Sequence, residues 1–108
     1  MILFEVHAVT GINIRTTENY WRYIVEVKHP ESFKRMGIEK AATHAKDALS
    51  KPVVVIKGRT DPAVHQYYKS IHDYFICVVA KHLNGEGYII TAYRTDRVSG
   101  GEVVWGRR

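Results

Sequence analysis

Cysteine and long apolar runs are nearly absent from this 108-residue sequence. The single Cys77 excludes an internal disulfide and any thiolate-rich zinc site, and its apolar neighbours indicate core packing. No apolar run approaches the roughly 20 residues that a membrane-spanning helix needs. Residues 1–5 reach a charge with no basic segment before them, which is not the pattern of a signal peptide. These absences predict a cytoplasmic protein without membrane association.

Motifs that bind metals or nucleotide cofactors are also missing. The six histidines form no HxxxH pair, and there is no CxxC motif. No pair of carboxylates lies in the apolar setting that acid–base hydrolases use, and no glycine-rich phosphate loop follows a predicted strand. We therefore expect neither a metal nor a cofactor.

What the sequence does contain is apolar residues sufficient for a core, and an excess of positive charge. Hydrophobic residues make up 45% of the chain, which suits a single domain over residues 1–108. The net charge is +5, of which residues 51–108 carry +4, so the second half favours a phosphate-bearing partner. The seven tyrosines could stack on RNA bases or simply pack within a sheet.

The first half of the chain predicts two short strands followed by two helices. Apolar residues alternate over 2–7 and 12–16, as in strands. Residues 18–28 have helical spacing, with a strand as the alternative because tyrosine and valine are frequent there. Residues 31–50 show the clearest helical periodicity, and Gly37 either kinks this helix or divides it.

The second half predicts a run of antiparallel strands. They are expected at 53–56, 64–69, 73–82, 88–95 and 102–105. Asn84 to Gly87 is a strong hairpin signal between the two longest strands. The predicted fold class is therefore α+β, with the N-terminal helices packed on one face of a twisted antiparallel sheet of four to five strands.

The two longest strands carry candidate functional side chains. Lys81 ends the first of them, and the second sends Thr91 and Tyr93 to one face of the sheet and Arg94 to the other. An odd number of loop residues in the hairpin would align Lys81 with Thr91 and Tyr93, and an even number would align it with Arg94. The sequence leaves this register open.

Short motifs in the same order occur in a known group of nucleases. They are Trp21 and Ile24 ahead of His29-Pro30-Glu31, then Lys51 to Val54, Tyr67-Tyr68, Val78 to Lys81, Ile89 to Thr95, and Val103 to Trp105. Over residues 15–105 the chain resembles small nucleases of the Barnase–EndoU–colicin–RelE superfamily, especially the phage- and toxin-type families. The resemblance implies N-terminal helices on a four-stranded antiparallel sheet.

The resemblance also implies metal-independent cleavage of RNA. In that reaction a base removes the proton of a ribose 2′-hydroxyl, whose oxygen attacks the adjacent phosphate, while an acid protonates the leaving 5′ oxygen. By resemblance His29 is the acid/base, Lys81 stabilises charge, and Thr91 and Tyr93 contact the phosphate.

Further expectations concern binding and partners. Arg59 and Arg94 are candidates for contacts with the RNA backbone, because a guanidinium matches phosphate geometry. The leading hypothesis is a toxin-type endoribonuclease held in check by a cognate antitoxin protein. The alternatives are a non-catalytic RNA- or protein-binding module on the same scaffold, and a structural protein whose basic excess is incidental.

Overall fold

The computed structural model describes all residues 1–108 and contains seven strands and four helical segments. The strands are β1 (Ile2–His7), β2 (Asn13–Thr17), β3 (Val54–Lys57), β4 (Val64–Ile71), β5 (Tyr74–His82), β6 (Glu86–Thr95) and β7 (Glu102–Gly106). The helical segments are α1 (Glu18–Tyr23), the π-helical turn η1 (Ile24–Lys28), the 3₁₀ turn η2 (Pro30–Phe33) and α2 (Gly37–Ser50). Neither α1 nor α2 has the length and apolar character that crossing a membrane requires.

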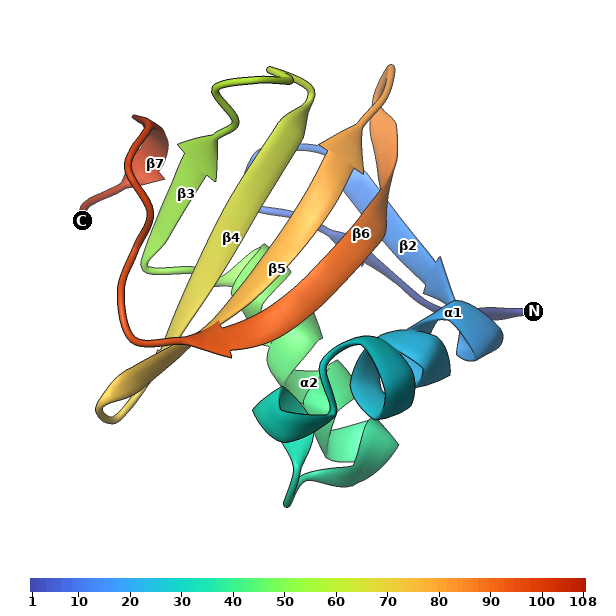
Figure 1. Ribbon diagram of the computed structural model, residues 1–108. Helices are drawn as coiled ribbons and strands as arrows, with labels where there is room; N and C mark the ends of the chain where they lie inside the picture. Colours follow the sequence, from blue (N-terminus) through green and yellow to red (C-terminus); the bar gives the residue numbers. More distant parts are fainter.

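All seven strands form one sheet, in the order β1-β2-β6-β5-β4-β3-β7 (Figure 1). Neighbouring strands are antiparallel except β2 and β6, which run parallel and pair Ile14 with Gly87. The predicted fold class is therefore wrong: the protein is a mixed α/β domain, and its sheet has seven strands rather than four to five. The prediction missed that the hairpin β1–β2 joins the main sheet, because alternation identifies a strand but not its partner.

The predicted helix over 18–28 forms as two different segments. Thr17 caps α1 by accepting a hydrogen bond from the Tyr20 amide at 3.2 Å. After Tyr23 the backbone widens into η1, which ends where the His29 amide donates to the Ile24 carbonyl at 2.9 Å. The helical prediction is thus confirmed over the strand alternative, although the helix is not α-helical throughout.

The predicted helix over 31–50 is divided at Gly37. This residue has φ +78°, a left-handed conformation that glycine adopts without steric cost, and α2 begins there. The helical segment before Gly37 is only the short turn η2, which begins at Pro30. The division turns residues 31–36 away from the axis of α2. These residues line one wall of a groove.

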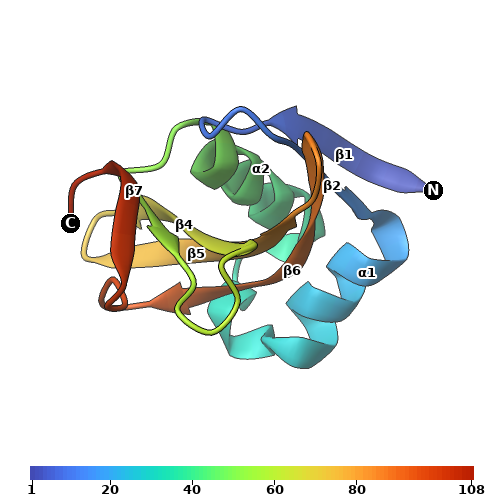
Figure 2. The ribbon, with the colours of Figure 1, turned by 90° about the horizontal axis from the view of Figure 1, so that it is seen from above.

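The main core lies between α2 and the curved sheet. The sheet curls so that β4 and β5 face one side of α2 and β1 approaches it from another (Figure 2). Ala41, Ala45 and Ala48 are fully buried on this helix, and their small side chains allow it to lie close to the strands. Trp21 fills the space beside α2 and donates from its indole to the Ile38 carbonyl at 3.2 Å.

A second, smaller core covers the opposite face of the sheet. Its buried members are Val54, Ile56, Tyr68, Cys77 and Val79. Burial raises the pKa of the Cys77 thiol to about 12, so the expectation of core packing rather than reactivity is confirmed. The loop before β7 closes over this cluster, with its Ser99 hydroxyl 2.7 Å from the hydroxyl of Tyr68.

Candidate nucleic-acid interface

The pairing of β5 with β6 settles on which face of the sheet the candidate residues lie. Val79 pairs with Thr91, so their side chains share a face, and Tyr93 lies two positions further along that face. The register shifts after Val79, between this pair and the turn, but Lys81 still lies two residues beyond Val79 on the same face. Arg94 points to the opposite face. Of the two open registers, the structure has the one that aligns Lys81 with Thr91 and Tyr93.

A shared face does not bring Lys81 to Tyr93. Tyr93 pairs with Cys77, four residues before Lys81, which separates the two positions by about 13 Å along the strand. The Lys81 ammonium instead donates to the Asp61 carboxylate at 2.8 Å. This hydrogen bond and the charge of Asp61 raise the pKa of Lys81, and they neutralise its charge locally. Lys81 therefore belongs to an ion pair at the far end of the face.

His29 and Tyr93 do come together. Their ring centroids are 5.5 Å apart, with His29 held at the junction of η1 and η2. Partial burial and the neighbouring Lys28 lower the pKa of His29, so its imidazole is neutral and can accept a proton at neutral pH. Burial, together with the Cys77 thiol beside it, raises the pKa of Tyr93, so its hydroxyl remains a hydrogen-bond donor. The pair combines a neutral base with an O–H donor.

The other predicted residues are more scattered. The Thr91 hydroxyl lies on the face of Tyr93 but is buried without a hydrogen-bond partner. Arg59 is exposed in the loop after β3, and its guanidinium lies against Gly100. The Arg94 guanidinium lies 3.9 Å from the ring centroid of Tyr74, on the helix-covered face. The six predicted residues therefore do not form one cluster; only His29 and Tyr93 are in contact.

Arg94 belongs to a group of basic side chains whose other members were not predicted from the sequence. A groove of about 550 Å³ lies between the loop before α2, the α2 surface and the turn joining β4 to β5. Arg94 lines this groove together with Lys34, Arg35, Lys40 and His44. The only local signal was the spacing of Lys40 and His44, which places them on one face of a helix.

Comparison with known protein families, curated proteins and solved structures finds no match to this chain.

Proposed function

We propose that the protein is a metal-independent endoribonuclease in which His29 is the base. The observation that carries the proposal is the contact between the neutral His29 ring and Tyr93, at a half-buried position on a basic domain. His29 takes the proton of a ribose 2′-hydroxyl, and the freed oxygen attacks the adjacent phosphorus. The bond from phosphorus to the 5′ oxygen breaks, and water protonates this leaving oxygen. The products are a 2′,3′-cyclic phosphate and a 5′-hydroxyl end.

Tyr93 has a separate role in this proposal. Its hydroxyl donates a hydrogen bond to a phosphate oxygen as negative charge develops in the transition state. Because the Tyr93 proton is held firmly, the residue serves as a donor and not as the acid.

The proposal includes a cytoplasmic location and control by an antitoxin protein. The edges of the sheet support a protein partner, since β1 and β7 are the outermost strands and edge strands can pair with another chain. On β7 the side chains of Val103, Val104 and Trp105 are each 39% exposed. This apolar edge suits a partner strand.

A non-catalytic RNA-binding module is the second candidate. The observation that favours it is the ion pair between Lys81 and Asp61, which leaves the His29–Tyr93 pair without the cation that the resemblance implies. Such a protein would bind RNA through its basic surface and leave it intact.

The decisive experiment is incubation of the pure protein with end-labelled RNA in EDTA. We expect cleavage that leaves a 2′,3′-cyclic phosphate, with no cleavage of DNA of the same sequence. His29→Ala should lower the rate by about 100-fold or more, as loss of a general base does. Tyr93→Phe should lower it by about 100-fold, as loss of a transition-state donor does.

Matched variants control for effects on folding and charge. His7→Ala and Tyr23→Phe change exposed residues of the same types and should cleave at the wild-type rate. Lys81→Ala should also retain cleavage, because its ammonium is held by Asp61. Binding of RNA without cleavage would establish the second candidate, and full activity of His29→Ala would remove His29 from the site.

A further inference from the structure

The groove beside α2 concentrates positive charge. It is lined by residues of the loop before α2, of α2, of the turn between β4 and β5, and of β6. Its lysine and arginine residues are Lys34, Arg35, Lys40 and Arg94, and its only carboxylate is Glu31. The groove thus holds an excess of three positive charges, out of a net charge of +5 for the whole chain.

Most of these cations have no partner within the protein. Arg35, Lys40 and Arg94 form no ion pair. Glu31 lies 3.7 Å from Lys34, but both side chains are largely exposed, so this pair is weak. Arg94 stacks on Tyr74, which fixes the plane of its guanidinium without using any of its N–H donors. The groove therefore presents oriented and unneutralised donors.

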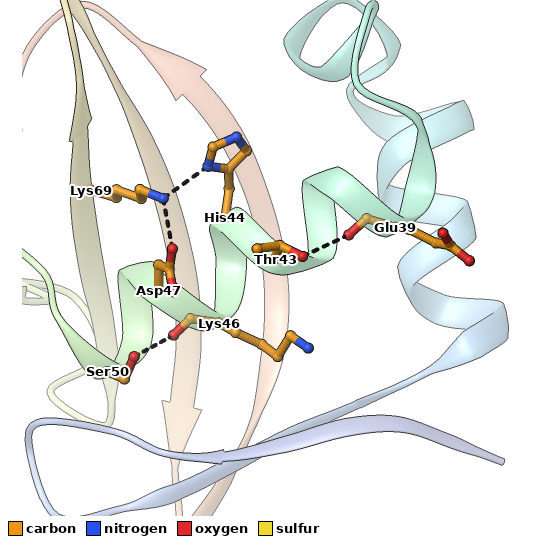
Figure 3. Close-up of polar contacts among 7 residues, drawn as sticks. All are labelled: Glu39, Thr43, His44, Lys46, Asp47, Ser50 and Lys69. Carbon is orange, nitrogen blue, oxygen red and sulfur yellow. Dashed lines mark hydrogen bonds and ion pairs between the residues drawn. The ribbon is translucent and has the colours of Figure 1, made fainter.

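His44 adds a neutral donor whose orientation is determined by its neighbours. The Lys69 ammonium lies 2.9 Å from His44 Nδ1 and 2.9 Å from Asp47 Oδ2 (Figure 3). An ammonium only donates hydrogen bonds, so Nδ1 must accept and the ring proton must lie on Nε2. His44 Nε2 has no hydrogen-bond partner in the protein, and His44 lines the groove. Lys69 is thus a positioning residue for an N–H donor.

A strained turn adds another side chain to the same groove. His72, in the turn between β4 and β5, has φ +52° and is the only residue other than glycine with positive φ. Glycine would adopt this conformation at lower cost. His72 lines the groove, so a function of its side chain would explain why a residue other than glycine occupies the turn.

We propose that this groove binds the phosphodiester backbone of single-stranded RNA. Arg94 and Lys40 would contact phosphate oxygens through charged donors, and His44 would contact them through Nε2–H. The groove volume of about 550 Å³ is that of a small-ligand pocket, which suits a short extended stretch of a single strand. The choice of RNA as ligand rests on the proposed function, while the existence of a phosphate site does not.

The test measures binding without cleavage. A short fluorescein-labelled RNA with 2′-O-methyl groups cannot be cut by attack of the 2′ oxygen, and its affinity can be followed by fluorescence anisotropy over a series of KCl concentrations. Arg94→Gln and Lys40→Gln should each weaken binding by about tenfold, as loss of a charged hydrogen bond does. Each should also reduce the slope of log K against log [KCl] by about 0.7, because one phosphate contact is lost.

Lys51→Gln is the matched control, since Lys51 is an exposed lysine beyond the end of α2 and outside the groove. Its affinity and salt slope should equal those of the wild type. Equal losses in the control and the groove variants, or no loss in either groove variant, would overturn the proposal. A wild-type protein that binds through the groove but cleaves nothing would refute the proposed activity alone.

A final variant tests the role of Lys69. Lys69→Met should weaken RNA binding and also release His44 from its single tautomer, which ¹⁵N NMR of the imidazole reports directly. A variant that binds RNA as tightly as the wild type, or a His44 that is protonated on Nδ1 in the wild type, would remove His44 from the site.

Discussion

A half-buried pair of histidines should make the stability of the domain depend on pH. His82 stacks on His65 with ring centroids 3.8 Å apart and an angle of 7° between the rings. The Tyr67 hydroxyl lies 2.6 Å from His82 Nε2 and also 2.6 Å from the Thr10 hydroxyl. Burial lowers the pKa of His82 to about 4, and the adjacent His65 adds to this effect. The folded protein therefore holds His82 neutral.

The sign and size of the effect follow from this pKa. An unfolded histidine titrates near pH 6.5, so on acidification the unfolded chain takes up a proton that the folded protein rejects. Stability is greatest above about pH 6.5 and falls until about pH 4. The full shift corresponds to about 3 kcal/mol of unfolding free energy. Because the ring is half-exposed, solvent screening reduces this to about 1–2 kcal/mol.

Urea unfolding followed by circular dichroism at several pH values measures this contribution. His82→Gln keeps an amide near Tyr67 but does not titrate, so near neutral pH it should be less stable than the wild type by about 1 kcal/mol. As the pH falls to about 4, this difference in unfolding free energy should shrink or reverse. Only the wild type is destabilised on acidification, because only its unfolded chain binds a proton at residue 82. His7→Gln changes an exposed histidine and should follow the wild type. A difference between His82→Gln and wild type that is constant with pH would refute the reasoning.

Two further substitutions test the backbone geometry. Gly87→Ala should lower the free energy of unfolding by about 1–3 kcal/mol, because the added Cβ would collide with the Lys81 carbonyl oxygen. Urea unfolding measures this loss, and an unchanged midpoint would contradict the predicted clash. His72→Gly should raise the free energy of unfolding by about 1 kcal/mol, because glycine adopts φ +52° without steric cost. The same variant should bind RNA more weakly in the anisotropy assay. A destabilised variant would show that the turn is not strained.

The sequence predicted most elements but not how they pair. Strands β3 to β7 lie within two residues of their predicted positions, because short β-branched runs between turn residues are local signals. The order of the sheet depends on contacts between distant segments, such as Ile14 with Gly87. Nothing local to either residue indicates this pairing, so the parallel pair and the seven-stranded sheet could not be predicted.

The candidate site was predicted only in part for the same reason. His29 and Tyr93 were both singled out, but their contact depends on how η1 lies against β6. The sequence left open whether Lys81 shares a face with Tyr93; the structure places it on that face, but further along the strand and bound to Asp61. The basic groove combines four segments, of which only β6 with Arg94 was singled out from the sequence, and the fold brings them together.

The parallel pair of β2 with β6 also constrains how the chain can fold. Residues 13–15 pair with residues 86–88, so the hairpin of β1 and β2 cannot join the main sheet until residues 86–88 are available. Closing so long a loop is slow, because its entropic cost precedes any gain from the contact. During synthesis Ile14, which is fully buried in the folded protein, therefore lacks its partner on β6 until β6 has left the ribosome. The domain should therefore acquire its final structure only after β6 has been synthesised and can pair with both β2 and β5.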